Sequence, residues 1–181
     1  MTLLAVAVVI TAVLCVFSLL LNFGVIRRLR EHTEMLTKLT NRSDAAGGVM
    51  HPAGTKLPAL TATTAEGAQI NVGGAGRSTL VGFFTPSCPA CAERLPEFVA
   101  LAAQMPGGPD EVVAVAVGDL QETADLRAKL AGAARVVAEA DQGPVGRAFG
   151  VQGYPAFAVL DSSTIVFSGF DLHGVPLPEA V

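Results

Sequence analysis

The chain of 181 residues is long enough for one domain with additional segments, but short for two full domains. Hydrophobic residues make up 51% of it, its formal net charge is −4, and it contains one Tyr and no Trp. This acidic balance excludes the basic surface that nucleic acid requires. The three cysteines, Cys15, Cys88 and Cys91, cannot all pair, which excludes a framework of structural disulfides.

The excess of hydrophobic residues lies at the N-terminus. Residues 3–26 carry no charged side chain, and about 20 apolar residues already span the hydrocarbon core of a bilayer. A cleaved signal peptide would have basic residues before the apolar run, whereas here Arg27, Arg28 and Arg30 follow it. The sequence therefore predicts an uncleaved, single-pass transmembrane helix over residues 3–26 that contacts the lipid bilayer, with Cys15 as an inert apolar residue in its middle.

The charges beside this helix predict the side of the membrane on which the main domain lies. Residues 27–42 hold five Lys/Arg and two Asp/Glu, whereas residues 43–181 hold seven and fourteen. Basic flanks favour the cytoplasmic side of a membrane. This rule places the main domain in the cytoplasm.

Two segments connect the predicted membrane helix to the main domain. Leu29, Leu36 and Leu39 recur at helical spacing and predict a helical stalk over residues 27–39. At under two heptads, a solvated stalk is favoured over a dimerising stripe. Residues 40–56 are rich in small and polar residues and lack periodicity, which predicts a flexible linker.

From residue 57 onward, strand and helix patterns alternate. Extended segments and strands are expected at residues 57–60, 69–72, 79–85, 111–117 and 135–138, helices at 91–105, 121–130 and 145–149, and a closing hairpin at 156–160 and 164–170. The β-branched run at 111–117 is typical of a central buried strand. Alternation followed by a hairpin predicts an α/β domain over residues 57–181, with helices on both faces of a sheet.

The motif Cys88-Pro89-Ala90-Cys91 stands where a predicted strand ends and a helix begins. Unpaired backbone N–H groups and the positive end of the helix dipole stabilise a thiolate at that place. Pro89 suits the first helical position, where an N–H would have no partner. The spacing puts both sulfurs within bonding distance, so Cys88 can attack a disulfide and Cys91 can resolve the mixed disulfide.

A zinc site is the alternative use of two neighbouring cysteines. It would need two further Cys or His ligands at a workable spacing. His51 and His173 form no paired motif, and we expect both in surface loops. The sequence therefore predicts neither a metal nor a cofactor.

The residues around the dithiol resemble a known family. Residues 83–91 (Phe-Phe-Thr-Pro-Ser-Cys-Pro-Ala-Cys) are similar to the active-site segment of membrane-anchored thioredoxin-like disulfide reductases with a redoxin domain, most of all the methylamine dehydrogenase accessory proteins (MauD) and their TlpA and ResA relatives. Pro96 matches the helix-kinking proline of that fold, and residues 150–155 match the run that ends in a cis-proline facing the dithiol. The resemblance covers roughly residues 57–170 and implies a thioredoxin-like fold, a central mixed sheet flanked by helices.

The resemblance implies a membrane-anchored thiol–disulfide oxidoreductase that works as a reductase. Its partners would be a cysteine-containing protein substrate and an upstream thiol or disulfide donor. It also implies a domain on the extracytoplasmic face of the cell membrane, where disulfides persist, against the indication of the basic flank. The residues that it marks are Cys88 and Cys91 as catalytic, Pro89 and Ala90 as the active-site loop, and Ser87, Tyr154 and Pro155 as substrate-binding.

Three positions depart from the family pattern. Ser87 stands where Trp usually precedes the first cysteine, and Gly82 stands where thioredoxins carry a buried acid. The glutamate of ResA-type proteins would fall near Arg94, with Glu93 only a neighbour. The general acid/base for Cys91 is therefore unassigned, with water and Glu93 as the open choices.

Two other functions are also compatible with the sequence. Thr85-x-x-Cys88 matches part of the peroxiredoxin active site, which would make the chain a thiol peroxidase. Val81 stands where peroxiredoxins have a proline, however, and Cys91 is placed for dithiol exchange. The third possibility is a non-catalytic assembly factor that keeps the fold.

Overall fold

The computed structural model describes residues 10, 48–74 and 76–176. Contacts between residues divide the chain into two units, Met1–Ala46 and Gly47–Val181. The fold described below is that of the second unit alone.

The predicted transmembrane helix at residues 3–26 and the predicted stalk at 27–39 lie outside the described residues, apart from Ile10. Among the residues that are described, no helix is both long enough and apolar enough to cross a membrane. The membrane anchor therefore stays a prediction from the sequence.

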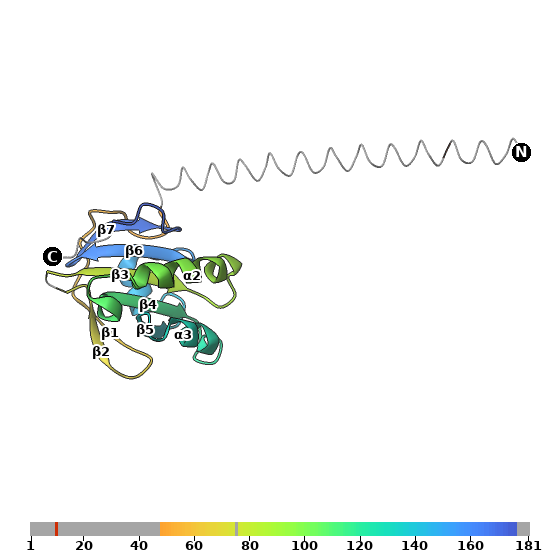
Figure 1. The fold of residues 1–181 in the computed structure, drawn as a ribbon, viewed down its shortest axis with the longest axis horizontal. Helices are drawn as coiled ribbons and strands as arrows, with labels where there is room; N and C mark the ends of the chain where they lie inside the picture. Colours follow the sequence, from red (N-terminus) through yellow and green to blue (C-terminus); the bar gives the residue numbers. More distant parts are fainter. Residues whose placement is uncertain (1–9, 11–47, 75, 177–181) are drawn as a thin grey trace, which may run out of the picture. The chain divides into compact units, whose positions relative to one another are not determined.

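The second unit is built on a five-stranded mixed sheet with the strand order β5-β4-β3-β6-β7 (Figure 1). Strand β3 pairs in parallel with β4, which pairs in parallel with β5, whereas β6 runs antiparallel to both β3 and β7. Strands β1 and β2 form a separate antiparallel pair. The elements in chain order are β1 (Leu60–Thr63), β2 (Gln69–Val72), β3 (Ser78–Phe84), α2 (Pro89–Ala102), η1 (Gly108–Glu111), β4 (Val112–Val117), α3 (Ala124–Leu130), β5 (Arg135–Glu139), α4 (Pro144–Phe149), β6 (Ala156–Asp161) and β7 (Thr164–Gly169).

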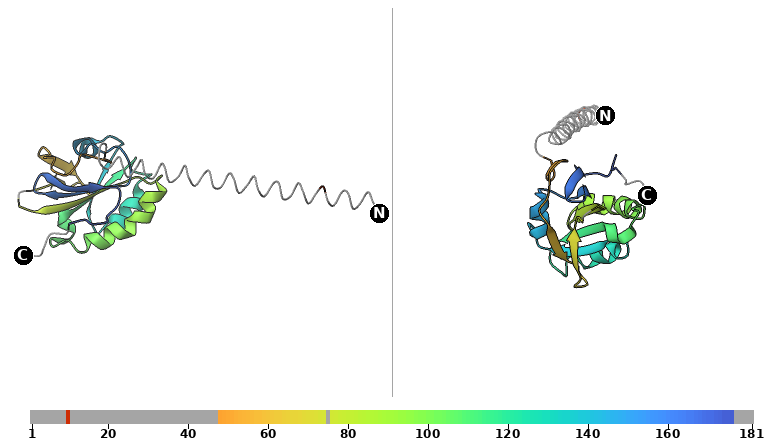
Figure 2. Two further views of the ribbon diagram at one scale, coloured as in Figure 1. Left: turned by 90° about the horizontal axis from the view of Figure 1, so that it is seen from above. Right: turned by 90° about the vertical axis from the view of Figure 1, so that its left-hand side faces the viewer.

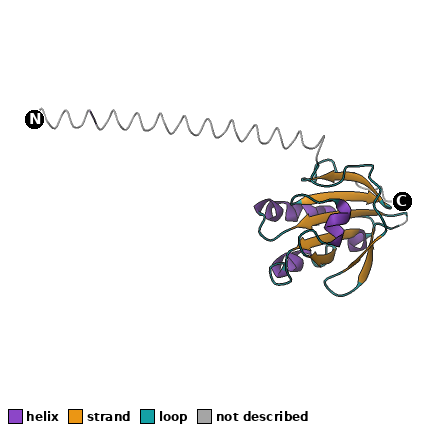
Figure 3. Ribbon diagram, turned by 180° about the vertical axis from the view of Figure 1, so that it is seen from behind, coloured by secondary structure: helices purple, strands orange, loops and turns teal. Residues whose placement is uncertain are grey.

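The mixed sheet is covered on both faces, which confirms the predicted α/β architecture. One apolar core contains Leu95 and Phe98 of α2 together with Leu130 of α3. The other contains Val145 and Phe149 of α4 together with residues of the β1–β2 pair. Figure 2 shows α2 and α4 on opposite sides of the strands, and Figure 3 shows the same layers from behind.

Strand β4 is a central strand of this sheet and is buried on both faces. All six residues of Val112–Val117 are buried, and successive side chains alternate between the two cores. A parallel strand that is covered on both faces is expected to be apolar throughout. The β-branched run in the sequence is therefore explained by its position between β3 and β5.

Residues 48–56 correct one prediction, because they pack on the domain. Val49 and Met50 are 4% and 3% exposed, and the His51 N–H donates to the Phe149 carbonyl at 2.9 Å. Lys56 forms a β-bridge with Thr164. The flexible linker predicted over residues 40–56 is wrong for this part, since two apolar residues make no periodic pattern yet still cover the core beside α4.

Gly82, in the middle of β3, occupies the position at which a buried acid was expected from thioredoxins. A Cβ atom at Gly82 would lie 2.6 Å from Cε2 of Phe98 and 2.8 Å from Cε2 of Phe84. The ring centroids of these two residues are 5.1 Å apart, and both rings also lie near that of Phe157. Aromatic rings therefore fill the space that a side chain at position 82 would need.

We expect Gly82→Ala to lower the free energy of unfolding by about 1–3 kcal/mol, because overpacking a close-packed core forces its neighbours to move. The measurement is urea unfolding of the full chain, followed by circular dichroism. Gly74→Ala is the matched control, since a Cβ there would meet no atom within 4 Å. Equal unfolding midpoints for the two variants would contradict this account of Gly82.

Candidate active site

The dithiol lies at the edge of the sheet where the parallel strands β3, β4 and β5 end. After β3, the Cys88 N–H donates to the Thr85 carbonyl at 3.3 Å, and this turn leads directly into α2. Cys88 is the N-cap of α2, with Pro89 in the first turn of the helix, and its Sγ accepts the N–H of Cys91 at 3.2 Å. The sulfur of Cys88 therefore caps the N-terminus of α2, and the helix begins directly after Cys88, as the motif predicted.

The two thiols lie in different environments. Cys88 is half-buried, whereas Cys91 is 3% exposed and belongs to the apolar core under α2. Burial, together with the hydrogen bond to the Cys88 side chain, raises the pKa of Cys91 to about 12. Cys91 is therefore a protonated thiol at neutral pH, and Cys88 is the sulfur that a substrate can reach.

Tyr154 faces the dithiol just before β6 begins, and Pro155 follows it. Their peptide bond is cis, as predicted. The Cys88 thiol donates to the backbone carbonyl of Tyr154 at 3.4 Å, across 66 residues of sequence. The structure thus brings three of the predicted site residues, Cys88, Cys91 and Tyr154, into one cluster.

The other predicted site residues form the rim of this cluster. Ser87, Pro89 and Ala90 are all exposed around the half-buried Cys88. Pro155 is buried at the entrance to β6. Their contacts with a substrate stay predictions, but the rim leaves Cys88 open to an approaching chain.

The acid/base candidates on α2 offer no group buried beside Cys91. Arg94 forms an ion pair with Glu97 at 3.0 Å on a partly exposed face of the helix. Glu93 is exposed to solvent. The proton acceptor for Cys91 therefore stays a prediction, with water and Glu93 as the choices.

The sequence did not predict a role for two carboxylates at this edge, Glu139 and Asp141. Glu139 ends β5 and is 9% exposed, and its carboxylate accepts the N–H groups of Val145 and Gly146 at 2.9 and 2.8 Å. Burial raises the pKa of Glu139, against the opposing effect of these two hydrogen bonds. The only signal in the sequence was an acidic residue shortly before a Gly-Pro helix start.

The second of these carboxylates, Asp141, binds the side chain of Tyr154. The Tyr154 hydroxyl donates to Oδ1 of Asp141 at 2.8 Å. Burial, followed by this hydrogen bond, raises the pKa of Tyr154 above its usual value. The phenol therefore stays protonated and acts as a donor at any physiological pH.

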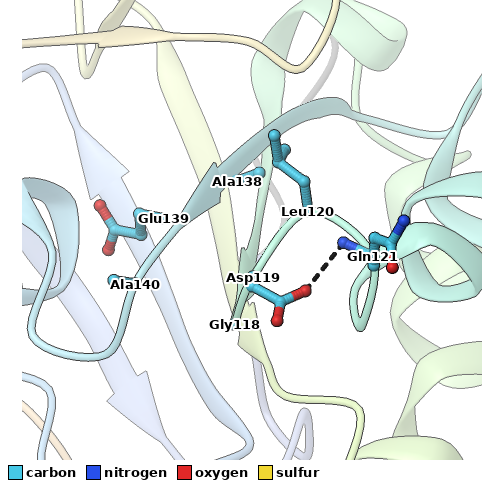
Figure 4. A pocket seen from close by; sticks show the side chains of 7 residues that line it. All are labelled: Gly118, Asp119, Leu120, Gln121, Ala138, Glu139 and Ala140. Carbon is cyan, nitrogen blue, oxygen red and sulfur yellow. Dashed lines mark hydrogen bonds between the residues drawn. The ribbon is translucent and has the colours of Figure 1, made fainter.

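A pocket of about 560 Å³ opens at the ends of β4 and β5 (Figure 4). Within it, Leu120 is 66% exposed. A Cβ added at Gly118 would lie 3.8 Å from Cδ of Pro86, so the pocket adjoins the turn that carries Cys88. The lining residues are Gly118, Asp119, Leu120, Gln121, Ala138, Glu139 and Ala140.

No group of three or more His, Cys, Asp or Glu side chains in the described part of the chain is arranged to hold a metal ion. Cys88 and Cys91 are both free thiols. The chemistry that the described site offers is therefore that of a pair of cysteines in unequal environments.

Comparisons with known proteins agree with this geometry. The family model described as Redoxin matches residues 52–171. No curated protein matches the chain. Among solved structures, a candidate thioredoxin from Neisseria meningitidis is 24% identical, with 66% of this chain and 83% of that chain covered and a TM-score of 0.55.

Two further structures are similar. A secreted disulfide oxidoreductase from Mycobacterium tuberculosis, described as homologous to DsbE of E. coli, is 24% identical, with 63% and 84% of the two chains covered and a TM-score of 0.52. The thioredoxin domain of a thiol-disulfide oxidoreductase from Bacteroides vulgatus is 18% identical, with 65% and 88% covered and a TM-score of 0.53. At these identities the likeness shows the fold, which is thioredoxin-like as predicted.

We expect iodoacetamide to alkylate Cys88 at least about tenfold faster than Cys91 in the reduced, folded chain at pH 8, since the thiolate is the nucleophile and burial raises the pKa of Cys91 to about 12. Tandem mass spectrometry of the peptide that contains both cysteines measures the two rates. In guanidinium, which unfolds the chain, the alkylation rates of Cys88 and Cys91 should become equal. Equal rates in the folded chain would contradict the assigned roles.

Proposed function

This chain belongs to the Redoxin family, and on that basis we propose that it is a thiol–disulfide oxidoreductase that acts on cysteines of a partner protein. One observation carries the proposal. A half-buried Cys88 thiol at the start of α2 lies beside the Tyr154 carbonyl and one helical turn from the buried thiol of Cys91. This is the arrangement that a two-step disulfide exchange requires.

The reaction follows from the unequal thiols. The thiolate of Cys88 attacks one sulfur of a substrate disulfide, which forms a mixed disulfide and releases the other substrate sulfur as a thiolate. Cys91 then loses its proton and attacks the Cys88 sulfur, and the remaining substrate sulfur leaves. The substrate gains two electrons and two protons, and Cys88 and Cys91 become a disulfide. An upstream thiol donor returns the pair to the dithiol.

The carbonyl of Tyr154 explains how the partner would be held. In the free dithiol it accepts the Cys88 S–H at 3.4 Å. When Cys88 enters a mixed disulfide it has no proton to donate, so this acceptor is released. An extended partner segment that brings a backbone N–H beside Tyr154 can then bind to it, as in strand-addition complexes. In the sequence, Ser87 directly precedes Cys88 and Pro155 directly follows Tyr154.

We propose the reductase direction and a membrane anchor for this protein. The reductase direction rests on the resemblance to MauD, TlpA and ResA proteins. The anchor rests on the uncharged run of residues 3–26, and an extracytoplasmic domain rests on the same resemblance. The basic residues 27–30 favour the opposite side of the cell membrane, so the topology requires its own test.

We expect the full chain to accelerate insulin reduction by dithiothreitol. Cys88→Ser should return the rate to the uncatalysed value, because it removes the attacking sulfur. Cys91→Ser should lose turnover and accumulate a mixed disulfide with insulin, which non-reducing electrophoresis detects. Cys15→Ser is the control and should behave as the unmodified chain.

Three results would argue against this function. Peroxide consumption that survives Cys91→Ser would identify a peroxidase. If the chain oxidises the thiols of a reduced protein faster than it reduces insulin, it works as an oxidase and not as a reductase. Inactivity of the folded chain in all of these assays would favour the third possibility, a non-catalytic assembly factor.

For topology, alkaline phosphatase or a fluorescent protein fused after residue 181 reports the side on which the domain lies. We expect phosphatase activity and no fluorescence, since the phosphatase folds only where disulfides form. The reverse result would place the domain in the cytoplasm, in agreement with the basic flank.

A further inference from the structure

Tyr154 contacts two different parts of the site. Its backbone carbonyl accepts the Cys88 thiol at 3.4 Å, and its hydroxyl donates to Oδ1 of Asp141 at 2.8 Å. We propose that Asp141 is a positioning residue for the dithiol, because it holds the Tyr154 carbonyl against Cys88 through the Tyr154 side chain. This role deepens the proposed oxidoreductase function and rests on it.

The turn that carries Asp141 is itself fixed. It connects β5 to α4, and the Gly143 N–H closes it on the Ala140 carbonyl at 2.9 Å. Gln142 adopts a φ of 56°, and its side-chain amide donates to the Val151 carbonyl at 3.4 Å. The segment before α4 is thereby joined to the segment after it, which leads on to Tyr154.

The buried carboxylate of Glu139 joins the end of β5, where this turn begins, to the first turn of α4, where it ends. Its two oxygens accept the N–H groups of Val145 and Gly146 at 2.9 and 2.8 Å. A Cβ at Gly143 would lie 2.5 Å from Cδ of Glu139, so the backbone packs directly on the carboxyl group. Asp141 therefore projects from a rigid base, and its hydrogen bond can transmit that rigidity to Tyr154.

The side chain of Tyr154 suits the role of a connector. It is partly buried and packs against both apolar cores, so it lies at the edge between the two layers. If packing alone held the ring, the side-chain torsion angles of Tyr154 could still fluctuate. The hydroxyl–carboxylate bond removes this freedom at the far end of the ring.

A fixed carbonyl opposite Cys88 favours one redox form of the site. Its oxygen accepts a hydrogen bond from the thiol, whereas neither a thiolate nor a disulfide sulfur has a proton to donate. The contact therefore stabilises the dithiol relative to the disulfide. A thiol is a weak donor, so loss of this contact should change the equilibrium constant by only about 2- to 5-fold.

The test is a double-mutant cycle in the full chain, with Cys15→Ser as the common background. Asp141→Ala and Tyr154→Phe each remove one partner of the bond, and Tyr154→Phe keeps the ring and the backbone carbonyl. The equilibrium of the Cys88–Cys91 pair with glutathione is measured by trapping and mass spectrometry. We expect each variant to shift it about 2- to 5-fold toward the disulfide, where tenfold would correspond to about 30 mV for a two-electron couple.

Two features of the cycle are specific to a positioning role. The double variant should shift the equilibrium no further than either single variant, because both remove the same hydrogen bond. Asp141→Asn keeps a side-chain oxygen that can accept the hydroxyl and should stay close to the parent. Asp110→Ala makes the same charge change at an exposed site of η1, before β4 begins, and should have no effect.

An unchanged equilibrium in Asp141→Ala, or additive effects in the double variant, would overturn the proposal. Urea unfolding midpoints show whether a variant has lost stability as well as the Tyr154–Asp141 bond. A shift of the equilibrium that occurs only in Asp141→Ala, together with a lower urea midpoint of that variant, would also count against the proposal. The measurement needs no protein substrate. A chain that shows the coupled shift but does not reduce insulin would reject the proposed function and leave the role of Asp141 intact.

Discussion

The hydrogen bond from the Cys88 thiol to the Tyr154 carbonyl joins two parts of the fold that are separate in the sequence. Cys88 belongs to the parallel unit of β3, α2 and β4, and Tyr154 introduces the antiparallel strands β6 and β7. The register of the sheet creates this contact. Because Phe83 pairs with Ala156, the end of β3 and the beginning of β6 lie at the same edge, and the residues just beyond each strand must meet there.

The same edge separates the roles of the two sulfurs. The first turn of α2 leaves Cys88 at the rim, while Cys91 enters the core that contains Leu95 and Phe98. Burial raises the pKa of Cys91, so this thiol is protonated at neutral pH. On the proposed mechanism, this difference in burial across one helical turn makes Cys88 the attacking thiol and Cys91 the resolving thiol.

The sequence predicted the elements of the domain and its dithiol, because both depend on local pattern. Alternating apolar runs identify strands, and the motif at residues 88–91 needs only a strand before it and a helix after it. The packing of Val49 and Met50 on the core escaped prediction, since two residues show no period. Asp141 escaped for a related reason. A single carboxylate in a loop has no pattern, and its contact with Tyr154 exists only after α4 has folded between them.

The absence of an acid at Gly82 has a consequence for how the proposed reaction handles its proton. Phe84 and Phe98 fill that space, the hydrogen bonds of Glu139 go to the Val145 and Gly146 N–H groups rather than to Cys91, and the Tyr154 phenol is protonated. Among the described residues, none of these groups is hydrogen-bonded to the Cys91 thiol as a base would be. The first exchange step, however, releases a substrate thiolate beside the dithiol. On the proposed mechanism that thiolate can take the proton that Cys91 must lose, directly or through water, so that the reaction generates its own base.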